Sequence, residues 1–175
     1  NYARTVSKGR LTQEEMDKRM SLIIPTENFD DLGDGDIVIE AVYENLDLKK
    51  EIFGRLDKVM KQGALLATNT SGLDVDAIAG MTDRPEFVCG MHFFSPANVM
   101  RLLEVVRGKD SSPVVLGTAM ALGKRLGKVS VMAGNCPGFI GNRMLGGYTR
   151  QAATMILEGA TPAQVDKVIF DFGLA

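Results

Sequence analysis

The chain has 175 residues, which is enough for one ordinary domain or for a domain and part of another. Apolar residues make up 45% and the formal net charge is −2, so a sizeable core is available and we expect no nucleic-acid partner. No apolar run reaches the roughly 18 residues that a membrane span needs, and no signal-peptide pattern opens the chain. Only two cysteines occur, Cys89 and Cys136. We therefore expect no disulfide framework, no metal site and a reducing, cytoplasmic location.

The first residues predict one helix and one short strand. Thr12 and Glu15 form a capping-box pattern before apolar residues at helical spacing, which predicts a helix over 12–21. The apolar run Leu22–Ile24 ends at Pro25 and indicates a strand. Residues 28–36, rich in acidic residues and glycine, indicate a loop.

Strands and helices then alternate up to Asn135. The stretch 36–42 is apolar almost throughout, a pattern typical of a parallel strand covered on both faces. The elements that follow are a helix from Asn45 to Gly63, a strand at 64–68, a helix at 73–79, strands at 87–93 and 102–106, a helix from Ser111 or Ser112 with Pro113 to Gly127, and a strand at 128–133.

Beyond Asn135 only helices are predicted, one over 137–158 and one that begins at Thr161. This change indicates an α/β fold in which a partial doubly wound, Rossmann-type sheet is followed by the start of an all-helical domain. We place the domains at 1–134 and 135–175. The sheet should belong to an incomplete doubly wound domain, because no G-x-G-x-x-G pattern occurs in the chain.

His92, the single histidine, stands near the end of a predicted strand, where ligands of open α/β sheets bind. Histidine titrates near neutrality and suits proton transfer. Glu104 interrupts the next apolar strand, and a buried carboxylate needs a partner. A His92–Glu104 pair would orient the imidazole and stabilise its cation. The alternative is a core histidine bonded to backbone with Glu104 on a solvated edge, and spacing alone leaves both open.

Other polar residues also follow predicted strands, and each has a structural alternative. Ser71, after Asn69 and Thr70, could bond a ligand or cap the next helix. Glu44 and Lys49 could reach the same site within a helical turn or form an ordinary charged helix start. Asn142 could bond a carbonyl at the domain junction or lie on a helix surface.

Taken together, these segments resemble one family. In order and spacing, the chain is similar to the 3-hydroxyacyl-CoA dehydrogenases, particularly to the dehydrogenase part of multifunctional fatty-acid β-oxidation enzymes. The resemblance covers essentially the whole chain. The segments that carry it are Asn69-Thr70-Ser71, His92-Phe93-Phe94-Ser95-Pro96, Leu103-Glu104-Val105 and Pro137-Gly138-Phe139-Ile140-Gly141-Asn142-Arg143.

The resemblance implies NAD-dependent oxidation of a 3-hydroxyacyl-CoA thioester to the 3-oxoacyl-CoA. It implies that His92 removes the hydroxyl proton while Glu104 supports the imidazole, and that Ser71 and Asn142 bond substrate oxygens. The positions that match cofactor contacts are Val42, Tyr43, Glu44, Lys49, Ser71 and Ser95, the last standing where many members have asparagine.

The resemblance also implies that the family's first strand and Gly-rich turn precede Asn1. We therefore expect a fragment of a longer protein that binds NAD poorly and is slow or inactive alone, and a homo-oligomer or multifunctional complex for the intact protein. Alternatives are a 3-hydroxybutyryl-CoA dehydrogenase, a non-catalytic binding or assembly module, and a 6-phosphogluconate-type dehydrogenase. The last predicts a catalytic lysine at the junction, where this chain has Asn142 and Arg143.

Overall fold

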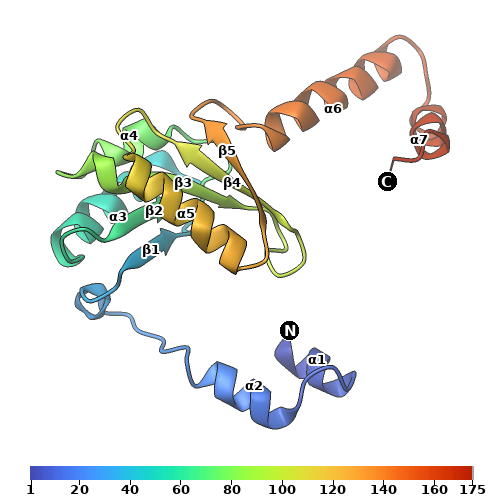
Figure 1. Ribbon diagram of the computed structural model, residues 1–175. Helices are drawn as coiled ribbons and strands as arrows, with labels where there is room; N and C mark the ends of the chain where they lie inside the picture. The colour runs from blue at the N-terminus through green and yellow to red at the C-terminus, as the bar shows by residue number, and fades with distance from the viewer. Residues whose placement is uncertain (175) are drawn as a thin grey trace.

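A five-stranded sheet forms the centre of the computed structural model, which describes residues 1–174 (Figure 1). The strands lie side by side in chain order, with β1, β2 and β3 parallel, β4 antiparallel to β3, and β5 parallel to β4. The predicted Rossmann-type α/β class, followed by helices, is confirmed. The strands are β1 (Ile37–Glu40), β2 (Leu65–Thr68), β3 (Val88–Phe93), β4 (Leu102–Arg107) and β5 (Val129–Gly134).

Helices cover both faces of the sheet (Figure 1). The helices are α1 (Tyr2–Ser7), α2 (Gln13–Met20), α3 (Leu46–Val59), α4 (Val75–Ala79), α5 (Pro113–Arg125), α6 (Gly141–Leu157) and α7 (Pro162–Asp171), with 3-10 turns at Phe29–Leu32 and Pro85–Phe87. Along β2, Leu65 and Ala67 pack with α5, whereas Leu66 packs with α3 and α4. This alternation follows from the two-residue period of a strand and gives two core layers.

The predicted helix starts are confirmed by their caps. Thr12 Oγ1 accepts a hydrogen bond from the Glu15 amide, and the Glu15 carboxylate accepts one from the Thr12 amide. Asn45 caps α3 by accepting from the Leu48 amide, and Ser112 caps α5 with Pro113 in the first turn. Each such cap contributes about 1 kcal/mol to helix stability.

Several expected boundaries are wrong. Leu22–Ile24 is not a strand, because no neighbouring strand pairs with it and its side chains stay exposed. β1 is shorter than 36–42 and Ile39 is 38% exposed, because β1 pairs on one side only, with β2. Residues 137–140 form a turn rather than helix, because Gly138 and Phe139 adopt positive φ angles. The helix α1 was not anticipated.

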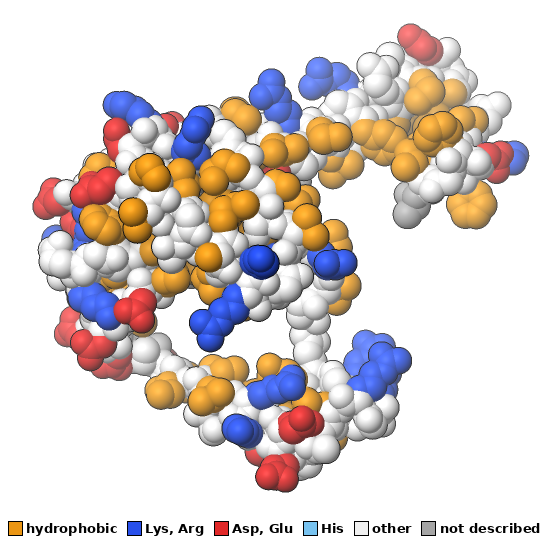
Figure 2. All heavy atoms as spheres, viewed as in Figure 1, with side chains coloured by type: hydrophobic (Ala, Val, Ile, Leu, Met, Phe, Trp, Pro, Cys, Tyr) orange, Lys and Arg blue, Asp and Glu red, His pale blue; other side chains and the backbone are white. Residues whose placement is uncertain are grey.

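The last two helices extend away from the sheet, and apolar side chains gather over them (Figures 1 and 2). In α7 only Val165 is buried, and α6 has no buried residue. The large exposed apolar side chains after α5 include Met144, Leu145, Leu157, Val168, Phe170 and Phe172. Within residues 1–174, no helix combines the length and the apolar character required to cross a membrane.

The packing of β3 against β4 leaves no room for a side chain at Gly90, which predicts a stability difference between substitutions at two glycines. A Cβ at Gly90 would lie 2.6 Å from Val106 Cβ, whereas a Cβ at Gly117, in exposed α5 surface, meets nothing within 4 Å. We expect Gly90→Ala to lower the free energy of unfolding by about 1–3 kcal/mol through overpacking. Gly117→Ala should raise it by about 0.5–1 kcal/mol through helix propensity. Urea unfolding measures both, and equal stability of the two variants would contradict the packing described.

Candidate active site

The β3–β4 hairpin places His92 directly opposite Glu104. Directly opposed residues on antiparallel strands lie within side-chain reach. His92 Nδ1 lies 2.8 Å from Glu104 Oε2, and the two residues are 6% and 0% exposed. The partner of the imidazole is therefore a buried carboxylate and not the backbone. Of the two alternatives left open by the sequence, the structure contains the His92–Glu104 pair.

The second oxygen of Glu104 binds the start of α6. Oε1 accepts hydrogen bonds from the backbone amides of Ile140 (3.0 Å) and Gly141 (2.8 Å). No side chain caps α6 at its own N-cap, so the Glu104 carboxylate satisfies amides that would otherwise lack a partner. An ionised carboxylate only accepts hydrogen bonds. With Glu104 ionised, Nδ1 of His92 is the donor in this contact, and the lone pair of the neutral ring lies on Nε2.

Two aromatic rings surround the imidazole. The Phe94 ring lies 4.3 Å from the His92 ring between centroids, and the Phe139 ring lies at 5.9 Å, both tilted. Such apolar walls lower the local dielectric constant, which strengthens the His92–Glu104 interaction.

Ser71 is held by Glu44 at the ends of β1 and β2. Glu44 Oε1 accepts from Thr70 Oγ1 (2.7 Å), the Ser71 amide (2.7 Å) and Ser71 Oγ (3.0 Å). Burial alone would raise the pKa of the Glu44 carboxyl, but the hydrogen bonds from Thr70 and Ser71, together with the Lys49 charge, hold this pKa below its ordinary value. Since the folded-state pKa is lowered, this contribution to stability is present at neutral pH and is lost as the pH falls through that value.

Lys49 is buried behind this group. Its Nζ donates to Glu40 Oε1 (2.8 Å) and to the Val42 carbonyl (3.3 Å), and it lies 3.4 Å from Glu44 Oε2. The side chain of Lys49 is only 1% exposed, so Lys49 influences the surface of the site through its ion pair with Glu44. Sequence reasoning missed Glu40, although it carried the same signal as Glu104, a carboxylate within an apolar strand.

Asn142 connects α6 with the Ser71 turn. Its Nδ2 donates to the Ser71 carbonyl at 3.1 Å. The two turns also touch directly, because a Cβ at Gly72 would lie 2.9 Å from the Gly138 amide nitrogen. Ser71 and Asn142, which were both predicted to bind substrate oxygens, therefore lie next to each other.

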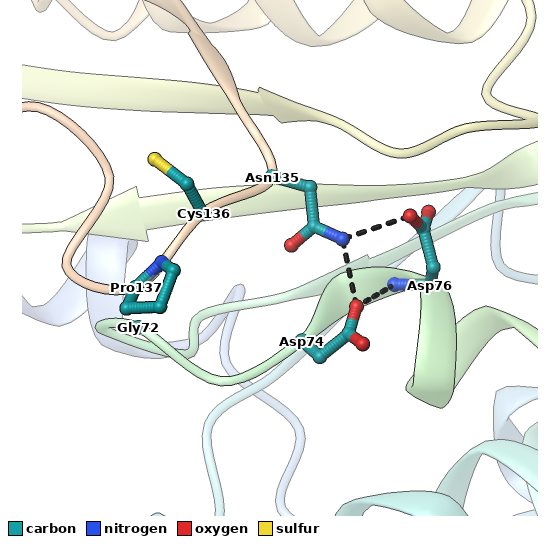
Figure 3. A pocket seen from close by; sticks show the side chains of 6 residues that line it. All are labelled: Gly72, Asp74, Asp76, Asn135, Cys136 and Pro137. Carbon is teal, nitrogen blue, oxygen red and sulfur yellow. Dashed lines mark hydrogen bonds between the residues drawn. The ribbon is translucent and has the colours of Figure 1, made fainter.

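A second link at the junction is made by Asn135, at the end of β5 (Figure 3). Its Nδ2 donates to Asp74 Oδ1 (2.7 Å) and Asp76 Oδ2 (2.9 Å), while its Oδ1 accepts from the Val75 amide. These bonds fix the start of α4 against the segment that leads into α6. They border a cavity of ≈ 360 Å³ that Cys136 and Pro137 also line.

The remaining predicted cofactor positions are exposed. Val42 and Tyr43 line an open cavity of ≈ 450 Å³ after β1, together with Ala41 and Leu48. Ser95 is exposed in the connection between β3 and β4. Within residues 1–174, no group of three or more His, Cys, Asp or Glu side chains has an arrangement that could hold a metal ion.

The chain is similar to a peroxisomal bifunctional enzyme from Danio rerio. The identity is 62% over 145 residues, which is 83% of this chain but only 20% of that protein, so the chain spans about a fifth of this relative. The expected cytoplasmic location is contradicted, because this relative is a peroxisomal protein. The cysteine pattern excluded only an oxidising compartment, whereas peroxisomal import is read from short address segments rather than from composition.

Two solved structures share the arrangement. An (S)-3-hydroxybutyryl-CoA dehydrogenase from Ralstonia eutropha is 36% identical with a TM-score of 0.93, covering 96% of this chain and 60% of that one. The dehydrogenase part of multifunctional enzyme 1 from C. elegans is 36% identical with a TM-score of 0.71, covering 99% and 40%.

Two family profiles match in succession. Residues 1–136 match the NAD binding domain of 3-hydroxyacyl-CoA dehydrogenase, and residues 138–175 match the C-terminal domain of the same family. The buried His92–Glu104 pair lies within the first match, and Asn142 lies within the second. The chain therefore belongs to the 3-hydroxyacyl-CoA dehydrogenase family, and its first 136 residues match the NAD-binding domain of that family.

Proposed function

We propose that this chain carries the dehydrogenase site of a multifunctional fatty-acid β-oxidation enzyme, which oxidises 3-hydroxyacyl-CoA to 3-oxoacyl-CoA with NAD. The observation that carries the proposal is the buried contact of 2.8 Å between His92 and Glu104 in a chain of this family. A histidine paired with a carboxylate is suited to take up a proton near neutral pH.

His92 is the proton acceptor in this proposal. Its Nε2 takes the proton of the substrate 3-hydroxyl group, and the Glu104 carboxylate stabilises the imidazolium that results. Ser71 and Asn142 bind the substrate oxygens. In the structure Ser71 Oγ donates to Glu44 Oε1, so its hydroxyl proton turns from Glu44 to the substrate oxygen when the substrate binds.

The residues after β1 fit the nicotinamide end of NAD. The cavity lined by Ala41, Val42 and Tyr43 is apolar, and polar groups of Glu44 and Ser71 lie at the ends of the neighbouring strands. When bound, NAD supplies the hydride acceptor for the carbon that His92 helps to oxidise. Val42, Tyr43, Glu44, Ser71 and Ser95 contact it in this proposal, and Lys49 acts from behind Glu44.

We further propose that the two domains meet near Asn135, at 1–134 and 135–175. The change from strands to helices after β5 supports this boundary. The exposed apolar side chains of α6 and α7 support burial of these helices in the intact protein, against a second copy or another part of the multifunctional enzyme.

Replacement of either member of the pair tests the proton transfer. In the intact parent enzyme, we expect His92→Gln and Glu104→Gln each to lower kcat for 3-hydroxyacyl-CoA by about 10²–10⁴-fold, because general base catalysis is lost or the wrong tautomer is held. NADH formation measures kcat, and binding of the CoA thioester should persist. Glu86→Gln, at an exposed position, is the control. Turnover of His92→Gln equal to that of the native enzyme would refute the assignment.

The supporting role of Lys49 gives a separate prediction. Lys49→Met leaves Glu40 buried without its cation, and we expect a loss of about 3–5 kcal/mol in the free energy of unfolding. Lys167→Met, which breaks the exposed Lys167–Asp171 pair, should change stability by less than about 0.5 kcal/mol. Lys49→Met also removes the cation beside Glu44, so we expect this variant of the parent enzyme to bind NAD more weakly. Equal stability of the two variants would contradict the buried network.

The second candidate is a 3-hydroxybutyryl-CoA dehydrogenase, favoured by the likeness to the Ralstonia eutropha enzyme. The two candidates differ in acyl chain length. We expect the parent enzyme to oxidise substrates of several chain lengths, with a kcat/KM that is not confined to the four-carbon substrate. A clear preference for the four-carbon substrate would favour the second candidate, and absence of NADH formation with every chain length would support a non-catalytic module.

A further inference from the structure

Phe139 is the one non-glycine residue of the described chain with a positive φ angle, +46°. This left-handed conformation is unfavourable for a residue with a bulky side chain, and such residues persist only where their surroundings hold them. The residue before it, Gly138, is also left-handed at +72°. Two successive left-handed residues make the chain reverse sharply just before α6, so that the amides of residues 140 and 141 face Glu104.

The side chain of Phe139 is the anchor of this turn. It is 2% exposed and packs in a cluster with Val75, Val106 and Ala133. These neighbours belong to α4, β4 and β5, so the ring is inserted into the sheet domain from the segment that leads into α6. Its ring also lies beside His92, at 5.9 Å between centroids.

The backbone of the turn is also enclosed. The Phe139 amide donates to the Cys136 carbonyl at 3.0 Å, and the Arg143 amide donates to the Gly138 carbonyl at 3.0 Å. On the other side, Gly138 touches Gly72. The backbone of residues 136–143 is therefore restrained on both sides while the Phe139 ring stays packed against Val75, Val106 and Ala133.

We propose that Phe139 is a positioning residue for His92, acting through the α6 amides and Glu104. Burial of the ring holds the left-handed turn, the turn presents two amides to Glu104 Oε1, and the carboxylate so fixed directs Oε2 to His92 Nδ1. The catalytic meaning of this chain of contacts rests on the proposed function, but the contacts themselves are testable without turnover.

The test uses the proton on His92 Nδ1, whose exchange with solvent reports how firmly the contact with Glu104 is held. His92 is the single histidine of the 175-residue chain, so its ring signals in a ¹⁵N-histidine-labelled sample need no further assignment. We expect Phe139→Ala to speed this exchange by at least about tenfold relative to Phe53→Ala. Phe53 is the matched control, because it is equally buried but lies in the α3 layer of the core.

Phe139→Gly separates the ring from the backbone conformation. Glycine adopts φ +46° without strain. If the ring is the anchor, Phe139→Gly exchanges as fast as Phe139→Ala, and native-like exchange in this variant would overturn the proposal. Phe139→Leu retains an apolar side chain and should restore most of the protection. If Phe139→Ala does not fold, Phe139→Leu is compared with Phe53→Leu, and the same ordering of exchange rates is required.

Activity of the parent enzyme provides the second readout. Misplacement of His92 affects the transition state, so Phe139→Ala should lower kcat by about 10–100-fold while the KM for the CoA thioester changes by less than about threefold.

Equal exchange rates in the Phe139 and Phe53 variants would refute the positioning role even if the enzyme is an active dehydrogenase. Faster exchange in Phe139→Ala, in a parent enzyme without dehydrogenase activity, would refute the function and leave the positioning role standing.

Discussion

The buried carboxylate of Glu104 is the interaction on which the arrangement of the site depends. It is fully buried, and a buried charge is costly unless it is paired and hydrogen-bonded. Its two oxygens accept from three donors in two parts of the chain, the imidazole of His92 on one side and the amides of Ile140 and Gly141 on the other. The same group therefore orients the histidine and attaches α6 to the sheet, so neither can move without disturbing the other.

The sheet explains why the carboxylate lies there. Had β4 followed β3 through a helical crossover, the two strands would run parallel and a residue twelve positions after His92 would not face it. The antiparallel return makes residues 92 and 104 direct cross-strand neighbours. A second buried charge network, Glu40 with Lys49 and Thr68, lies at the ends of β1 and β2 and holds Glu44 against Ser71. Two internally paired groups thus bring the polar side chains of the site to one edge of the sheet.

Much of this could be predicted from the sequence, because the signals are local. The caps at Thr12, Asn45 and Ser112 depend on a few neighbouring residues, and the alternation of buried strands with amphipathic helices indicated the fold class. The isolated carboxylate of Glu104 in an apolar strand indicated a buried partner. By contrast, Leu22–Ile24 resembled a strand because composition does not reveal whether a neighbouring strand is available to pair.

The parts that could not be predicted depend on contacts distant in sequence. The turn at Gly138 and Phe139 interrupts what a helical pattern suggested, since a left-handed phenylalanine is stable only in its tertiary socket. Lys49 was expected to contact the cofactor, and its burial behind Glu44 follows from Glu40, which lies nine residues earlier. The cap of α6 is supplied by Glu104 from 36 residues away, beyond the reach of any local pattern.

The central claim, that Glu104 fixes the orientation and protonation pattern of the His92 ring, is tested most directly by the ¹⁵N NMR spectrum of the labelled native chain. The two ring nitrogens of His92 give separate signals that report which one carries the proton. We expect the neutral ring to carry its proton on Nδ1, toward Glu104, with an unprotonated Nε2. A neutral ring that carries its proton on Nε2 would contradict the account, because Nδ1 would then have no hydrogen to donate to the carboxylate.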